Sequence, residues 1–269
     1  MIARVLALVV YGITALSSVA FAQSYPDMHP IGRSTAAPVL RAAAERREIH
    51  ERFLIGIQAL QSRGYSHAAA EFKRILSLHP AEPQGSTAHY NLALAYAGSR
   101  RLDAAGRELQ DAITLDPQFL AAFANLVAID IMRGDLAGAR TVAQRFLLIA
   151  PDSARALYAR GFVALRTNDA KVAAQDFGKL LQSNPSYALG HYNLGLAEIQ
   201  LQRYDIAERE LQASLTLAPD FARARFALGT VLLKQGRRSE ARVAFSQVLQ
   251  SSNDISLRNL ADAMLRTLR

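Results

Sequence analysis

Histidines and carboxylates are the side chains of this 269-residue chain that are best suited to acid–base or metal chemistry. The chain has six histidines, and none forms a close pair at the spacing of a metal site. His89 and His191 are each followed by Tyr-Asn-Leu, and this recurrence indicates a structural or surface role. The carboxylates of Glu208-Arg209-Glu210 alternate with a cation, as on a solvated helix face. Neither group predicts a reactive centre.

Sequence motifs of enzymes are also absent. We find no GxSxG, no HExxH, no phosphate-binding Walker loop and no dinucleotide-binding glycine pattern. The chain contains no cysteine, which excludes disulfides, thiol nucleophiles and thiolate metal sites. We therefore predict a protein that is not an enzyme and has no catalytic residue, no bound metal and no cofactor.

Prolines and alanines recur along the chain at a nearly constant interval. The steps between five prolines are 37, 34, 34 and 34 residues, and six alanines keep the same spacing. A fixed period of this size indicates a stack of similar units, each too small to bury its apolar face alone. These residues are Pro80, Pro117, Pro151, Pro185 and Pro219, and Ala68, Ala105, Ala139, Ala173, Ala207 and Ala241.

Each period has room for two helices of about a dozen residues and two turns. The proline ends the second helix, because it biases the preceding residue away from the helical conformation. Asp103, Asp169 and Asp205 are candidates for helix N-caps or first-turn acids. Glycine recurs at one position of the first helix, which indicates a close helix crossing there: Gly56, Gly161, Gly195 and Gly229.

Residues 188–219 resemble the tetratricopeptide repeat, a 34-residue helix-turn-helix unit. The resemblance rests on Leu194-Gly195, Tyr204, Ala207 and Pro219, and residues 88–117 match residues 190–219 at 16 of 30 positions. It covers about three quarters of the chain and implies an all-α right-handed superhelix, or solenoid, of about six helix pairs. We place the repeat domain at 38–269, with repeats at 49–80, 86–117, 120–151, 154–185, 188–219 and 222–253, and a capping helix at 255–268.

The positions of residues within these repeats predict two details of the packing. Ile255, Leu260, Met264 and Leu268 should line the packed face of the capping helix. Asp130 and Arg160 stand where the family prefers apolar or aromatic residues, so we expect them to form an ion pair between repeats. The alternative is that both charges point outward independently.

The N-terminus differs in composition from the repeats. Arg4 precedes an apolar run, and Ala20-Phe21-Ala22 forms a small-x-small cleavage site. This is typical of a secretory signal peptide, here residues 1–22, followed by a flexible leader at 23–37. We predict an exported, periplasmic bacterial protein. The alternative is an uncleaved N-terminal helix that anchors the chain in the membrane.

The resemblance also implies a binding surface, because the first helix of each repeat lines the concave groove in this family. Aromatic residues at that phase predict an apolar floor, with asparagine amides and basic residues beside it. Phe53 and Ile57 belong to the same floor. The predicted groove residues are Tyr90, Asn91, Leu94, Asn125, Arg155, Tyr158, Phe162, Arg166, Tyr192, Asn193, Leu196, Arg223, Phe226 and Lys234. The alternative is that the aromatics are simply part of the repeat core.

Charge is concentrated toward the C-terminus. Residues 222–269 contain nine Arg or Lys and three Asp or Glu, within a chain of net charge +8. The lysine of the family's carboxylate clamp is replaced by Tyr, Phe or Ala, so binding of a chaperone tail is not expected. We predict a non-catalytic scaffold in a bacterial envelope assembly that binds a protein or peptide, acidic and hydrophobic in character, and no nucleic acid. The alternative is a basic surface that binds an anionic polysaccharide or membrane.

Overall fold

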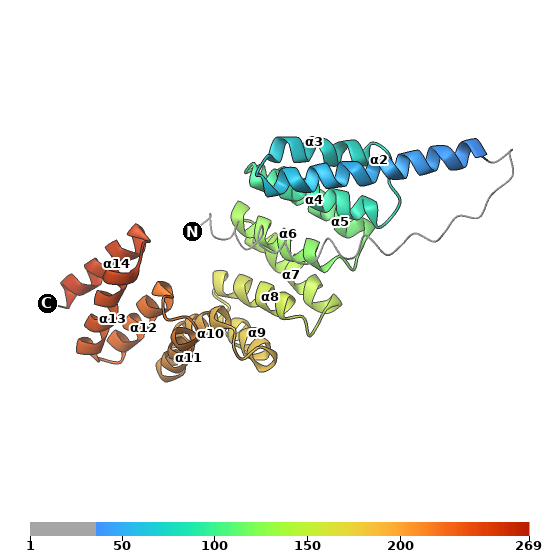
Figure 1. The fold of residues 1–269 in the computed structure, drawn as a ribbon. Helices are drawn as coiled ribbons and strands as arrows, with labels where there is room; N and C mark the ends of the chain where they lie inside the picture. Colours follow the sequence, from blue (N-terminus) through green and yellow to red (C-terminus); the bar gives the residue numbers. More distant parts are fainter. Residues whose placement is uncertain (1–35, 269) are drawn as a thin grey trace. The chain divides into compact units, whose positions relative to one another are not determined.

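The computed structural model describes residues 36–268, and all regular structure in this range is helical. The predicted all-α helical repeat fold is confirmed. The helices form two compact units, one ending at Val142 and the other beginning at Ala143 (Figure 1). The predicted signal peptide lies outside the described residues, as does the leader up to residue 35. Among the described helices, none is both long and apolar enough to cross a membrane.

The first unit is a series of antiparallel helices in which each of the first four contacts the next along the chain (Figure 1). The described part of the first helix begins at Ala36 and includes Pro38. Its helices are α2 (Ala36–Gln61), α3 (Tyr65–Leu76), α4 (Gln84–Gly98), α5 (Leu102–Leu115), α6 (Leu120–Arg133) and the start of α7 (Leu136–Ile149).

The second unit repeats the arrangement. Contacts between α8 and α10, α10 and α12, and α12 and α14 show that the even-numbered helices form one layer. These are the first helices of the repeats, and the odd-numbered second helices pack beside them. Besides the end of α7, the unit contains α8 (Ala154–Arg166), α9 (Ala170–Ser183), α10 (Ala188–Gln200), α11 (Tyr204–Leu217), α12 (Ala222–Lys234), α13 (Arg238–Ser251) and α14 (Ile255–Thr267).

The recurring glycines lie where the two helices of a repeat cross. A Cβ built on Gly229 would stand 2.8 Å from the Phe245 ring, and one on Gly195 would stand 2.8 Å from Leu211. Gly56 faces Phe72 and Gly161 faces Phe177 in the same way. The four facing side chains are fully buried. The large side chain of the second helix therefore occupies the space that a side chain on the first helix would need.

Short polar turns separate the helices, as the sequence indicates. Asp169 caps α9 by accepting a hydrogen bond from the Val172 N–H at 3.4 Å. Asp103 and Asp205 lie in the first turns of α5 and α11, where a carboxylate interacts favourably with the helix dipole. Gly134 ends α6 with a φ of 80°, a conformation that glycine adopts without steric cost.

The last helix packs through a face that includes two of the four predicted residues, Met264 and Leu268. Ala261 and Leu268 are buried, and Leu257 and Met264 pack against the same cluster as Phe245. Ile255 and Leu260 are instead 73% and 56% exposed. The expectation that these two residues line the packed face is therefore wrong: packing follows the 3.6-residue period through Leu257 and Ala261, and Leu260 falls beside that stripe.

Candidate functional site

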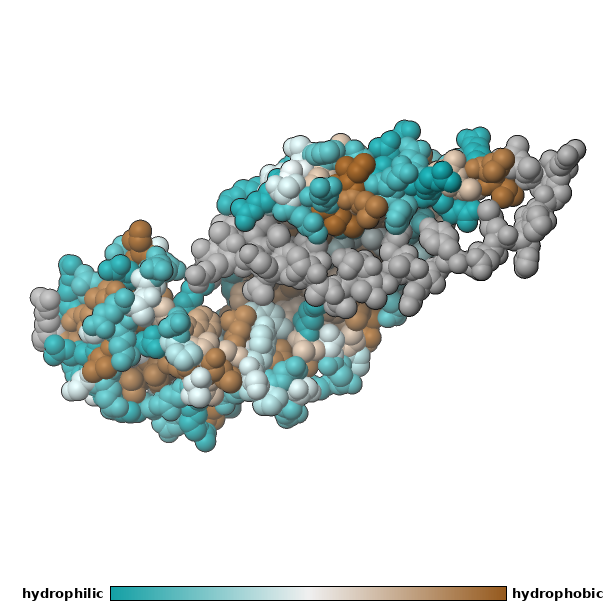
Figure 2. Space-filling view, in the orientation of Figure 1, coloured by the Kyte–Doolittle hydropathy of each residue, from teal (hydrophilic) through white to brown (hydrophobic). Residues whose placement is uncertain are grey.

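The layer of first helices in the second unit carries most of the predicted groove residues. Phe162 on α8, Tyr192 and Leu196 on α10, and Phe226 on α12 are half-buried, so each keeps part of its surface accessible. On the face of this unit that is seen in Figure 2, apolar residues lie interspersed among hydrophilic ones. This surface could contact a partner through apolar and charged groups together.

Tyr158 lies deeper than a groove floor residue would. Its ring contacts Phe177 at 5.8 Å and Tyr187 at 6.1 Å between ring centres, and its hydroxyl accepts a hydrogen bond from Asn193 Nδ2 at 3.3 Å. Burial, with a smaller contribution from Tyr187, raises the pKa of the Tyr158 hydroxyl strongly. The hydroxyl therefore stays neutral and joins α8 to α10.

The other predicted groove tyrosines also pack against neighbouring residues while they keep part of their surface accessible. Tyr192 packs on Phe221 at 4.8 Å, and Tyr90 packs on Phe119 at 4.9 Å. In each case the partner is the residue just before the next first helix, 29 positions later in the sequence. Both tyrosines remain half-buried. Each of these tyrosines therefore belongs in part to the repeat core and in part to the accessible surface, so both predictions apply to the same side chain.

The asparagines hold neighbouring helices together. Asn125 Nδ2 donates to the Tyr90 hydroxyl at 3.0 Å, in the same relationship as Asn193 to Tyr158. Asn91 Nδ2 donates to the Thr87 carbonyl at 2.9 Å in its own helix. All three side chains are buried, with Asn193 only 2% exposed. The expectation that their amides face a bound peptide is corrected: the amides of Asn125 and Asn193 join neighbouring repeats, and that of Asn91 bonds within its own helix.

Two further floor residues belong to the core. Leu94 and Phe53 are each 4% exposed, so a partner cannot reach them from solvent. Leu94 is on α4, where its sequence neighbours Ala93 and Ala95 are also buried. Ile57 stays half-buried. The groove prediction is therefore wrong for Leu94 and Phe53.

The predicted basic residues differ in their availability. Arg155 and Arg166 on α8 and Lys234 on α12 are exposed and have no ion-pair partner within residues 36–268. Arg223 instead pairs with Asp254 at 3.3 Å. The backbone N–H of Leu257, and then this arginine, lower the pKa of Asp254. Arg223 therefore fixes the start of α14 against α12.

Some of the basic residues of the C-terminal sequence form ion pairs within the fold. Arg237 contacts Glu208 at 2.7 Å and Glu240 at 2.5 Å, and these hydrogen bonds raise the pKa of its guanidinium. Arg266 pairs with Asp262 at 2.6 Å. Part of the excess of basic residues in the sequence is therefore used in ion pairs within the fold.

Asp130 and Arg160 each have a partner inside their own unit. Asp130 accepts a hydrogen bond from Arg133 at 3.2 Å, one helical turn away. Arg160 holds Asp176 through two hydrogen bonds. Asp176 is buried on the second helix of the same repeat, and the sequence analysis did not single it out. Asp176 could have been found from the sequence by its spacing of 16 residues from Arg160, because residues that face each other across a helix pair have this spacing.

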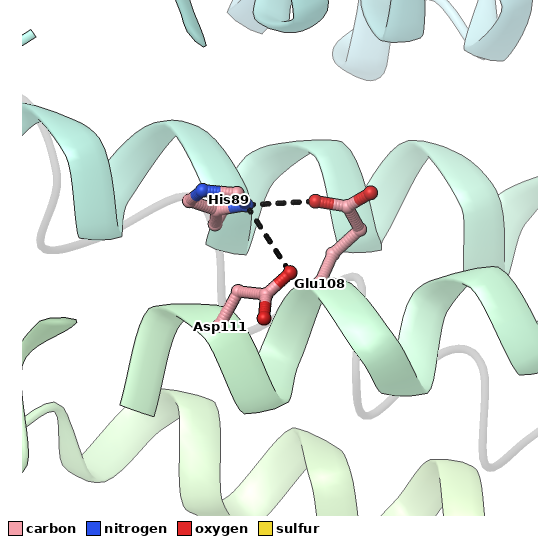
Figure 3. A group of neighbouring side chains, drawn as sticks. All are labelled: His89, Glu108 and Asp111. Atoms are coloured by element: carbon pink, nitrogen blue, oxygen red, sulfur yellow. Dashed lines mark hydrogen bonds and ion pairs between the residues drawn. The ribbon is translucent and has the colours of Figure 1, made fainter. Parts of the chain in front are cut away.

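One group of side chains in the first unit has the composition of a metal site. His89 on α4 faces Glu108 and Asp111 on α5, and the possible ligand atoms all lie within 4.8 Å of one another (Figure 3). Within the described residues, no other group of three or more histidine or acidic side chains lies this close together. A search for close histidine pairs in the sequence could not find it, because the three residues come from two helices.

Comparisons with known proteins agree with this architecture. The human protein O-mannosyl-transferase TMTC3 is 26% identical over 148 residues, which is 55% of this chain and 16% of that protein. The chain thus spans a small part of this curated relative. The structure of the APC/C hetero-tetramer Cut9-Hcn1 matches with a TM-score of 0.65 at 22% identity, over 80% of this chain and 41% of that one.

A tetratricopeptide repeat protein from Parabacteroides merdae ATCC 43184 matches with a TM-score of 0.60 at 16% identity, over 82% of this chain and 99% of that one. At such identities the structural matches establish the fold alone. The sequence profile of the tetratricopeptide repeat matches residues 53–118, 133–188 and 192–254, more than half of the chain. The periodic sequence, the helix pairs and this match together place the chain in the tetratricopeptide repeat family.

Proposed function

We propose that this protein is an exported, non-catalytic scaffold whose second unit binds an acidic, amphipathic segment of another protein. The binding surface is the layer of first helices α8, α10 and α12. The observation that carries this proposal is the side-by-side occurrence, on those helices, of half-buried apolar groups and exposed cations without ion-pair partners. Repeats of this family typically serve protein interaction, and the related Cut9-Hcn1 structure is itself an assembly of different chains.

The chemistry of the surface selects the class of partner. Phe162, Tyr192 and Leu196 keep part of their apolar surface accessible, and burying it contributes about 25 cal/mol per Å². Arg155, Arg166 and Lys234 would interact with carboxylates at the edge and increase the association rate. An amphipathic helix or extended segment that carries acidic residues beside apolar ones fits both requirements.

The alternative of a polyanion-binding C-terminal end receives less support. Arg223, Arg237 and Arg266 already pair with carboxylates, so each would have to exchange an internal partner for a polyanion. Binding through a basic surface would weaken steeply with salt, whereas binding that depends on buried apolar area would persist. Salt dependence therefore separates the two functions.

Photo-crosslinking in cells tests the proposal. A photoreactive phenylalanine analogue replaces Leu196 or Lys234 on the first helices, and the matched controls replace Arg209 on α11 or Arg242 on α13, both exposed on second helices. We expect one protein adduct that is shared by the two first-helix positions and absent from the controls. Equal capture at all four positions, or capture at the second-helix positions alone, would contradict the proposed surface.

A charge-reversal pair then tests the acidic character of the partner. Arg166→Glu with Lys234→Glu should weaken binding of the captured partner at physiological salt, while Arg209→Glu should leave it unchanged, because Arg209 lies on a second helix. Binding that resists both the reversal and high salt would indicate a purely apolar partner and would overturn this part of the proposal.

Export is part of the same proposal and has its own test. It is supported by the N-terminal apolar run and by Ala20-Phe21-Ala22. N-terminal sequencing of the protein recovered from a bacterial periplasmic fraction should begin at Gln23. Recovery of the uncut chain from the membrane fraction would instead establish the anchored alternative.

A further inference from the structure

The His89 group differs in one residue from a structural ion pair that the fold uses elsewhere. His89 Nδ1 lies 2.7 Å from Glu108 Oε2, and His191 Nδ1 lies 2.7 Å from Glu210 Oε2 in a later repeat. The members of each pair are 19 residues apart and join the first helix of a repeat to its second. By itself, this pairing is an element of repeat architecture. It offers no reason to expect a ligand.

The two repeats differ at the residue that lies three positions after the glutamate. Asp111 lies three residues after Glu108, on the same face of α5, and its Oδ2 is 4.0 Å from His89 Nδ1. The corresponding position after Glu210 holds Ala213. In the later repeat, the other nitrogen of His191 lies 2.9 Å from the Pro185 carbonyl, so oxygen atoms hold that ring on both sides. The earlier repeat has a second carboxylate in place of this internal closure.

The local charge of the first group is unbalanced. Within residues 36–268, no arginine or lysine lies within ion-pair distance of Glu108 or Asp111, and His89 is their shared partner. The group therefore places two carboxylates beside one imidazole and offers three possible ligand atoms. The side chains of His89 and Glu108 are about one-fifth exposed and that of Asp111 is 58% exposed, so the group is reachable from solvent.

We propose that His89, Glu108 and Asp111 form a binding site for a divalent transition-metal ion of the zinc type. A tetrahedral zinc ion with bonds of about 2.0 to 2.2 Å holds neighbouring ligand atoms about 3.3 Å apart. The distances from Nδ1 of 2.7 and 4.0 Å bracket this value, and all three possible ligand atoms lie within 4.8 Å of one another, so modest side-chain rotations would bring them to an ion. One imidazole with two carboxylates favours such an ion over Mg²⁺, which prefers oxygen ligands and keeps its water.

Three protein ligands leave the remaining coordination positions to water or to a group from a partner. The site connects α4 to α5, so a bound ion adds a cross-link inside the second repeat. Binding requires the neutral imidazole and therefore weakens as the pH falls. This inference concerns the first unit and is independent of the proposed peptide surface.

Titration of the purified chain with ZnCl₂ tests the site, using protein without a histidine tag. We expect one ion to bind at pH 7, with a matching shift of the His89 Nδ1 resonance in ¹⁵N NMR spectra. Asp111→Asn should weaken binding at least about tenfold, since even the loss of an outer partner of a metal ligand has an effect of this size. His191→Ala is the matched control and should leave the affinity unchanged.

A gain of binding provides the reciprocal test. Ala213→Asp completes the same three groups beside His191 and Glu210, and this variant should bind a second zinc ion. Because Asp111 is largely exposed and Asn is nearly isosteric, circular dichroism of the Asp111→Asn variant should match that of the wild type. Equal zinc affinity of the wild type and Asp111→Asn, no second ion with Ala213→Asp, or displacement of zinc by Mg²⁺ at similar concentration would each overturn the assignment.

Discussion

Arg160 holds Asp176 across the α8–α9 helix pair through two parallel hydrogen bonds, from Nε to Oδ2 at 2.7 Å and from Nη2 to Oδ1 at 2.6 Å. The carboxylate is 2% exposed and the guanidinium 30% exposed. These bonds raise the pKa of Arg160. A buried carboxylate with both oxygens paired to one guanidinium is a strong geometric constraint on the fourth repeat.

Replacing the arginine alone should therefore destabilise the second unit. Arg160→Met keeps the aliphatic stem and leaves Asp176 buried without its partner, which we expect to cost about 2 to 3 kcal/mol. The double variant Arg160→Met with Asp176→Leu should recover much of this loss, because no charge then remains buried. Urea unfolding, with hydrogen exchange of the α8 and α9 amides, measures both variants. A double variant as unstable as the single one would contradict the explanation.

The glycine at the helix crossing provides a second prediction with an internal control. A Cβ on Gly195 would approach Leu211 to 2.8 Å, whereas one on Gly178 in α9 would meet nothing within 4 Å. Gly195→Ala should destabilise the protein by about 1 to 3 kcal/mol through overpacking. Gly178→Ala should stabilise it by up to about 1 kcal/mol, through helix propensity. Thermal unfolding midpoints that shift in the same direction for both would argue against a packing role for Gly195.

These two examples show which parts of the structure the sequence could predict. Gly195 was identified because its role recurs at one phase of several repeats, and a recurring position in a repeat array has a recurring environment. Asp176 was missed because the ion pair of Arg160 occurs in one repeat. Its spacing of 16 residues reflects the facing of two helices within a repeat. The phases instead predict a partner for Arg160 in the preceding repeat, Asp130, which pairs with Arg133.

The candidate surface was predictable for a similar reason, and to a similar extent. The position of each residue within the repeat period identified the first helices. Tyr192 and Leu196 lie on one layer of these helices and are half-buried. They could not reveal that Asn193 would be buried against Tyr158, because spacings of 35 residues between repeats become contacts only once the stacking geometry is known. The His89 group likewise requires knowledge of which faces of α4 and α5 meet.

The contact between Asn193 and Tyr158 yields a third prediction. Asn193 is buried and donates to the Tyr158 hydroxyl between successive first helices. Asn193→Ala should cost about 1 to 2 kcal/mol, because the hydroxyl loses its partner in a largely buried position. A double-mutant cycle with Tyr158→Phe should give a coupling of about 1 kcal/mol, measured by urea unfolding. Strict additivity of the two substitutions would show that this hydrogen bond does not stabilise the repeat interface.

Asp130 predicts a pH dependence of stability. Burial, and then the nearby Asp135, raise the pKa of its carboxyl in the folded state, and Arg133 opposes this shift only in part. Between the unfolded and folded pKa values, the folded state binds more protons than the unfolded state. The contribution of Asp130 to the free energy of unfolding therefore falls as the pH rises through this window. Below the ordinary carboxyl pKa of 3.8, both states are protonated and the penalty disappears.

Asp130→Asn isolates this effect, because all other titrating groups are common to both proteins. We expect the variant to be the more stable protein at pH 7, where the buried carboxylate is charged, and to lose this advantage below about pH 4. Arg133 retains its contact with Asp103 at 2.8 Å in either case, so the substitution leaves the guanidinium paired. The difference in urea midpoint between the two proteins, followed from pH 3.5 to 7, gives the sign directly. A wild type that becomes the more stable protein as the pH rises would mean that the Arg133 ion pair outweighs the cost of burying the carboxylate.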